Sequence, residues 1–91
     1  MQRNDLIPVK VECHSGYKAD EYPKRFYLDG YQFDVLEILD RWYQGDSSPG
    51  IAAANYFKIR TQNDKTFILK QEVQRGNWYL WIKGESLHLD L

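Results

Sequence analysis

Rings and positive charges alternate with apolar residues in the second half of this chain, and these are the side chains that could do chemistry. We expect three strands here, Tyr56 to Thr61, Thr66 to Gln71 and Trp78 to Lys83, because each alternates with a period of two. Alternation turns one row of each strand toward a core and leaves the other row outside. The outer rows hold Tyr56, Lys58 and Arg60, then Thr66, Ile68 and Lys70, then Tyr79, Trp81 and Lys83.

This outer face has the composition of a surface for single-stranded nucleic acid. Aromatic rings stack on unpaired bases, and lysine and arginine contact phosphates. The candidate binding residues are Lys58, Arg60, Lys70, Tyr79, Trp81 and Lys83. The first hypothesis is therefore a non-catalytic binding module that contacts a single strand through this face.

Two other interpretations of the same face stay open. Tyrosine and tryptophan are strong strand formers, and lysine and arginine stems cover apolar sheet surface, so the row fits an ordinary structural surface. Tryptophan, tyrosine and arginine also dominate the energetics of protein interfaces. The alternative hypothesis is a protein-interaction or self-association module.

Catalytic and metal-binding groups are sparse in the sequence. Asp34, Glu37 and Asp40 could work as acid and base, but a regular strand places Glu37 on the face opposite the other two. Cys13 and His14 are adjacent and point apart on a strand, and with His88 they are too few for a structural zinc site. We expect no catalytic residue, no metal and no cofactor, and a small enzyme is the least favoured alternative.

Size and composition bound the fold and the compartment. The chain has 91 residues, which suits one domain spanning 1–91, with a core at about 7–83 and a tail or edge strand at 84–91. The net charge of −1 argues against a strongly basic nucleic-acid binder but allows a local basic face. One cysteine permits no intramolecular disulfide, which favours a cytoplasmic location. No apolar run approaches the roughly 18 residues of a membrane span.

The first half of the chain predicts a strand and a hairpin. Ile7 to Cys13 alternates, and Pro8 suggests an edge position. Lys24 to Leu28 and Tyr31 to Val35 flank Asp29-Gly30, which is a strong signal for a two-residue turn. Such a turn predicts three cross-strand pairs: Leu28 with Tyr31, Phe26 with Phe33, and Lys24 with Val35.

Residues 34–44 allow two structures. Val35, Leu36, Leu39, Trp42 and Tyr43 have helical spacing, and Gly45 stands where a helix cap would. The alternative is one long strand from Tyr31 to about Tyr43, with a bulge near Leu36 to Leu39 that resets its phase. We favour the strand, because a helix from Asp34 would leave too little chain to complete the hairpin.

The remaining turns set the core and the fold class. Gly45 to Asn55 reads as a loop that allows a short helical turn at Ile51 to Ala54. Ile59 can oppose Phe67 or Leu69 only through an odd-length turn at Gln62 to Asp64. The core predicted on this parity is Phe57, Ile59, Phe67, Leu69, Trp78, Leu80 and Ile82. We expect an all-β fold, an antiparallel meander of five or six strands curled into a small open SH3-like barrel with little helix.

Several segments together resemble a known family. They are Val9 to Cys13, Ser15 to Tyr17, Pro23 to Phe26, Val35 to Trp42, Tyr56 to Arg60, Phe67 to Lys70 and Trp78 to Leu80. The chain resembles a family of short uncharacterised bacterial proteins. It is similar to a bacterial domain of unknown function that is sometimes appended to Y-family DNA polymerase-like proteins. The resemblance implies a recurring fold and carries over no established catalytic residues, and its polymerase association adds support by analogy to the nucleic-acid hypothesis.

Overall fold

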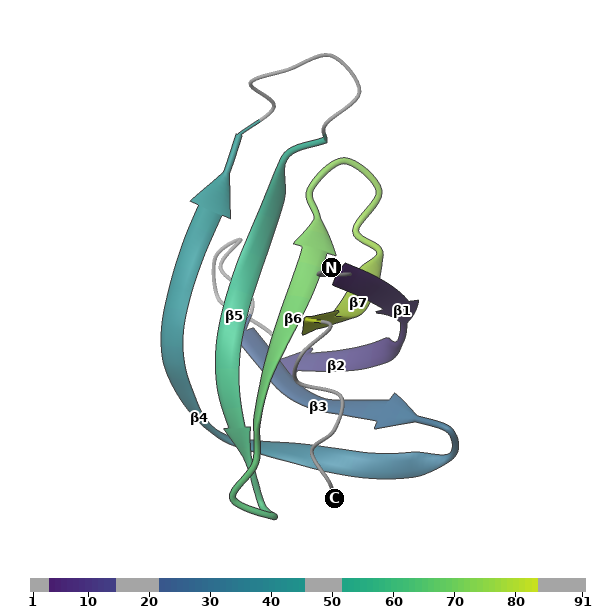
Figure 1. Ribbon diagram of the computed structural model, residues 1–91, viewed down its shortest axis with the longest axis vertical. Helices are drawn as coiled ribbons and strands as arrows, with labels where there is room; N and C mark the ends of the chain where they lie inside the picture. Colours follow the sequence, from purple (N-terminus) through teal and green to yellow (C-terminus); the bar gives the residue numbers. More distant parts are fainter. Residues whose placement is uncertain (1–3, 15–21, 46–51, 84–91) are drawn as a thin grey trace.

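Seven antiparallel strands form the structure, which is a computed structural model that describes residues 4–14, 22–45 and 52–83, with side chains at residues 6–14, 22–45 and 52–81. The strands are β1 (Asn4–Pro8), β2 (Lys10–His14), β3 (Tyr22–Leu28), β4 (Tyr31–Gln44), β5 (Ala54–Thr61), β6 (Thr66–Glu72) and β7 (Trp78–Lys83). Their order in the sheet is β1-β7-β6-β5-β4-β3-β2 (Figure 1). The predicted all-β class is confirmed.

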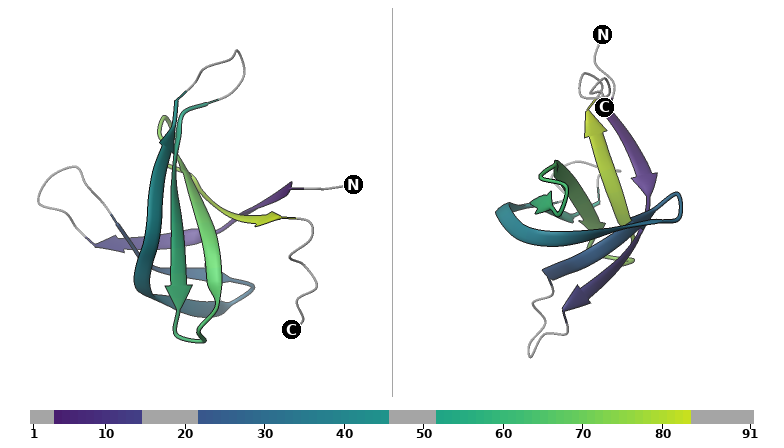
Figure 2. Two further views of the ribbon diagram at one scale, coloured as in Figure 1. Left: turned by 60° about the vertical axis from the view of Figure 1, so that its left-hand side comes forward. Right: turned by 90° about the horizontal axis from the view of Figure 1, so that it is seen from below.

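A kink near the start of the chain curls the sheet. β1 and β2 follow each other with only Val9 between them, yet β1 pairs with β7 and β2 pairs with β3. Pro8 has no N–H to give to a ladder, and the N–H of Val9 donates to the Trp78 carbonyl at 3.2 Å. The single strand predicted for Ile7 to Cys13 is therefore two strands that join opposite ends of the sheet into an open barrel (Figure 2).

The hairpin between β3 and β4 has the predicted turn. Asp29 and Gly30 have φ angles of 53° and 81°, as a type I′ turn requires at both central positions. Leu28 pairs with Tyr31 and Phe26 pairs with Phe33, as predicted. The predicted pair of Lys24 with Val35 is wrong, because β4 leaves β3 after the pair of Arg25 with Asp34.

Two bulges interrupt the pairing of β4 with β5 just after β4 leaves β3. The β4–β5 register shifts between Val35 and Glu37 and again between Ile38 and Asp40, so Leu36 and Leu39 are the extra residues. The predicted long strand with its bulge is confirmed, and residues 34–44 are not helical. Because each bulge adds one residue, the inward positions Val35, Ile38 and Arg41 recur every third residue, which imitates helical spacing.

The core lies on the inner face of the curled sheet. The buried cluster consists of Phe26, Phe57, Ile59, Leu69 and Leu80, and Phe67 and Trp78 pack against it partly buried. The odd-length turn is confirmed, since Ile59 pairs with Phe67 and Asp64 has the left-handed φ of 61°. Of the predicted core, only the side chain of Ile82 lies outside the described side chains.

The segment between β4 and β5 differs from its prediction at one end. β5 begins at Ala54, so Asn55 belongs to a strand, and Ala52 and Ala53 are not helical. Residue 51 and the predicted tail or edge strand at 84–91 lie outside the described residues. Within the described ranges, no helix is long and apolar enough to cross a membrane.

Candidate functional site: the outer face and the free edge of β4

Three aromatic rings lie in a row on the outer face of the sheet. The Trp42 and Tyr56 rings stack with centroids 5.2 Å apart and an interplanar angle of 3°. The centroid of the Trp81 ring lies 5.5 Å from that of Tyr56, and the two rings are tilted by 57°. The Tyr56 hydroxyl donates to the Gln44 side-chain oxygen at 2.8 Å. Tyr56 is only 7% exposed, although it belongs to the outer row. The rings of this row thus cover one another and leave Trp42, on β4, as its exposed end.

The cations of the outer face are largely matched by neighbouring groups. The Arg60 guanidinium lies 3.1 Å from a Glu37 carboxylate oxygen and 3.7 Å from an Asp64 oxygen. Lys58 is exposed and pairs across strands with Asp40. The Lys70 ammonium lies 5.8 Å from the centroid of the Tyr56 ring. Carboxylates therefore neutralise Arg60, whereas Lys58 lies opposite an acidic residue in the strand pairing and Lys70 contacts a ring.

The structure gathers five of the six predicted binding residues on one face, namely Lys58, Arg60, Lys70, Tyr79 and Trp81. Across β5, β6 and β7, Lys58 lies opposite Ile68, and Ile68 lies opposite Trp81. Two residues further along β6, Lys70 lies opposite Tyr79. Tyr79 and Trp81 are both half-buried. Lys83 is the last residue of β7 and pairs with Asn4, but its side chain lies outside the described side chains.

The acidic residues of β4 are placed differently from the prediction. Glu37 was expected on the opposite face, but the bulge at Leu36 shifts the phase, so Glu37 pairs with Arg60 on the outer face and Asp40 pairs with Lys58 there. The Asp40 carboxylate accepts a hydrogen bond from the Arg41 N–H at 2.8 Å. Both side chains are exposed, and Glu37 is engaged with Arg60. Among the described side chains, Glu37 thus pairs with Arg60, and Asp40 contacts the backbone of the next residue.

A second charged cluster ties β2, β3 and β4 together. The Arg25 guanidinium contacts Glu12 at 2.7 Å and Asp34 at 3.2 Å, and the Tyr27 hydroxyl donates to Glu12 at 3.0 Å. Arg25 first, then Tyr27, lowers the pKa of Glu12 below its usual value. A hydrogen bond from Gln32, then Arg25, lowers the pKa of Asp34. In return Glu12 raises the pKa of Tyr27 and, together with Asp34, that of Arg25.

One edge of β4 is left without a partner strand. β3 pairs only with residues 31–34 of β4, and β5 pairs with residues 35–44 along the other edge. Among the described strands, none pairs with residues 35–44 on the β3 side. We call this stretch the free edge. It carries large exposed apolar side chains, namely Leu36 (56% exposed), Leu39 (43%), Trp42 and Tyr43 (62%).

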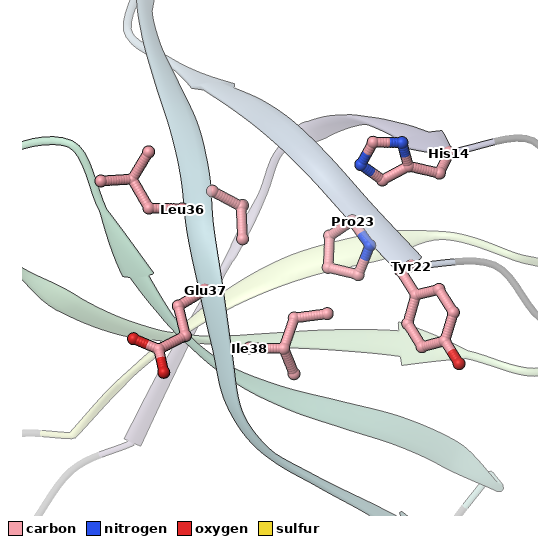
Figure 3. Close-up of a pocket in the computed structure, with 7 residues that line it drawn as sticks. His14, Tyr22, Pro23, Leu36, Glu37 and Ile38 are labelled. Carbon is pink, nitrogen blue, oxygen red and sulfur yellow. The ribbon is translucent and has the colours of Figure 1, made fainter.

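A groove opens where β3 and β4 diverge. It contains an open pocket lined by His14, Tyr22, Pro23, Val35, Leu36, Glu37 and Ile38. Pro23 and Ile38 face each other across it, whereas Leu36 and Glu37 point to the other side of the β4 ribbon (Figure 3). The groove is thus an apolar recess whose walls are two diverging strands.

Arg41 stands beside this groove. Its guanidinium carbon lies 5.3 Å from the centroid of the Tyr22 ring and 5.2 Å from that of Phe57. The ion pairs recorded among the described side chains involve Arg25 and Arg60 but not Arg41. The site therefore combines a strand edge without a described partner strand, apolar side chains and one cation that no carboxylate contacts among the described side chains.

The sequence interpretation missed Arg41, Trp42 and the free edge. Their faces depend on the bulge positions, which a parity count along a regular strand cannot supply. The three-residue recurrence of Val35, Ile38 and Arg41 was the available signal, and it also matches a helix.

Comparison of the chain with protein-family models, with curated proteins and with solved structures returned no match. The family resemblance read from the sequence stays a prediction.

Proposed function

We propose that this chain is a small non-catalytic protein-binding module that takes up an extended segment of a partner protein along the free edge of β4. The observation that carries the proposal is the edge of residues 35–44 away from β5, which has no partner among the described strands and carries exposed Leu36, Leu39, Trp42 and Tyr43. The chain has a single cysteine and therefore no intramolecular disulfide, so we expect a cytoplasmic location.

An extended backbone is the occupant that suits such an edge. An edge strand presents N–H and C=O groups that another strand can pair with, and adjacent side chains then add specificity. Exposed apolar side chains gathered on one strand mark interaction sites more often than scattered ones do. Asp40 occupies the Arg41 N–H, and the two bulges twist the strand, which limits unselective pairing of β4 with its own copies.

The nucleic-acid hypothesis receives less support from the described side chains. Phosphate binding needs protein cations that can neutralise phosphates and displace the counterions of the nucleic acid, but Arg60 is already paired with Glu37 and Asp64. Tyr56 is buried between its neighbours and offers no free face for a base. The exposed Trp42 and Lys58 are what keep this hypothesis as the second candidate.

A peptide selection tests the proposal. The immobilised protein is offered a display library of random twelve-residue peptides, and enriched peptides are titrated against wild type and two variants. The edge variant is L36K/L39K, which places charge on exposed edge positions. The control variant is V73K, which changes an equally exposed apolar residue after β6.

We expect the enriched peptides to bind wild type and V73K alike and to bind the edge variant at least about tenfold more weakly. Labelled dT12 and U12 strands at low and high salt form the parallel arm. Peptides indifferent to the edge variant, or tight salt-dependent binding of a single strand, would overturn the proposal. A dimer seen by light scattering for wild type but not for the edge variant would also overturn the proposal, because the free edge would then bind a second copy of the chain.

A further inference from the structure

The Arg41 guanidinium lies over two rings, and no ion pair engages it among the described side chains. Its guanidinium lies about equally far from the Tyr22 and Phe57 rings, at 5.3 and 5.2 Å from their centroids, and the side chain is exposed. Ring faces contact the plane of a guanidinium, whereas its N–H groups point outward within that plane. Such a group is preorganised for a carboxylate, which it can bind through two parallel hydrogen bonds.

The nearest carboxylates of β4 are engaged elsewhere. Asp40 accepts the Arg41 backbone N–H, and Glu37 contacts Arg60 on the outer face. Figure 3 shows Glu37 directed away from the side of β4 on which Ile38, Pro23 and Tyr22 lie. Among the described side chains, no carboxylate thus contacts Arg41 on the groove side, which leaves its positive charge available to a group supplied by a partner.

An apolar recess lies one inward position away from Arg41. Val35, Ile38 and Arg41 are successive inward positions of β4. Ile38 faces the buried Pro23 across the pocket, and His14 and Tyr22 form its rim (Figure 3). A side chain entering here would contact carbon atoms on both walls.

The register of β5 gives the spacing that an added strand would need. Arg41 pairs with Phe57, and Ile38 pairs with Ile59, so positions three apart on β4 face positions two apart on its partner. An antiparallel strand on the free edge meets the same bulged strand and takes the same step. Its residue beside Arg41 would precede its residue beside Ile38 by two positions.

We infer that the free edge selects an extended segment in which an acidic residue stands two positions before an apolar residue, the carboxylate binding Arg41 and the apolar side chain entering the recess at Ile38 and Pro23. This inference rests on the proposed function and specifies the partner that it requires.

The test repeats the library selection on wild type and on R41M, with R41K as the conservative variant. Wild type is expected to enrich peptides with an acidic residue two positions before an apolar one, and R41M is expected to lose the acidic preference. Wild-type peptides should bind R41M about ten- to hundred-fold more weakly, as loss of a charged hydrogen-bonded pair implies. R41K should fall between them, because it keeps the charge without the planar donors.

A change in the peptide avoids any effect of R41M on folding. Replacing the peptide's acidic residue by its amide should weaken binding to wild type by a similar factor and leave binding to R41M unchanged. Peptides that need the free edge but show no acidic preference, or that carry the apolar residue first, would overturn the inference while the proposed function stands. Peptides that ignore the edge variant would overturn both.

Discussion

Two arginines on neighbouring parts of the sheet are held in opposite ways. Arg25, where β2, β3 and β4 meet, contacts Glu12 and Asp34 and is largely shielded by them. Arg41 lies on β4 beyond Asp34, the last residue that pairs with β3, and its guanidinium lies over the rings of Tyr22 and Phe57 with no carboxylate contact among the described side chains. The first arrangement satisfies its charges internally. The second leaves a charge, an apolar recess and a free strand edge side by side.

The contrast separates structural residues from residues available to a partner. Where β3 pairs with β4, backbone and side-chain groups have partners within the chain. Beyond Asp34, β4 pairs with β5 along one edge and has no partner among the described strands along the other. Removing a residue from the paired region should therefore cost stability, and removing one from the free edge should cost binding.

The largest difference between the regions should appear on truncation of apolar side chains. Phe26 is fully buried and stacks on Phe33 with centroids 5.0 Å apart, so F26A should lose about 3–5 kcal/mol of unfolding free energy. L36A, on the exposed free edge, should change it by less than about 0.5 kcal/mol. Urea unfolding of both variants measures this, and a comparable loss in L36A would mean that the edge is packed.

A smaller effect is expected from the ring row that borders the free edge. Y56F removes the hydroxyl that donates to Gln44 and should cost about 1 kcal/mol, as a typical hydrogen bond does. Q44A in a double-mutant cycle should show that the two losses overlap. Additive losses would contradict a direct Tyr56–Gln44 bond.

The smallest predicted effect is a difference in acid sensitivity. The pKa values of Glu12 and Asp34 are lowered in the folded chain, so their ionised forms stabilise it above their ordinary pKa values. This stabilisation is lost as the pH falls through the lowered folded pKa values. The difference in unfolding free energy between R25M and wild type should therefore shrink on acidification from about pH 7 to pH 2.5, whereas the difference between R41M and wild type should stay constant.

Denaturant melts across this pH range measure both gaps. The variant Y27F tests the contribution of Glu12 separately, because it removes the hydroxyl that donates to this carboxylate and leaves Arg25 in place. An R41M gap that closes in acid would indicate that Arg41 has a carboxylate partner within the chain.

Local rules predicted much of this fold. Asp29-Gly30 fixed one hairpin, and the parity of Ile59 against Phe67 required the odd turn that Asp64 completes. The bulge in β4 was foreseen as a region, but its effect on faces was not. Each extra residue inverts the side on which all later side chains lie, so Glu37 could not be placed by counting.

The candidate site was harder to predict for the same reason. The sequence predicts Tyr56, Tyr79 and Trp81 on one outer face, yet the burial of Tyr56 depends on contacts with Trp42 from β4 and Trp81 from β7, which counting along a single strand does not supply. The free edge follows from where β4 leaves β3, which is a property of tertiary pairing. The sequence shows that residues 35–44 contain several large apolar residues, but not that they are exposed on a free edge.

Backbone amide hydrogen exchange with and without a selected peptide tests the central claim most directly. The account predicts slower exchange within residues 35–44 of β4 when the peptide binds wild type, little change in β6, and no slowing in L36K/L39K. Protection confined to the outer ring face, or unchanged exchange along β4 under saturating peptide, would contradict it.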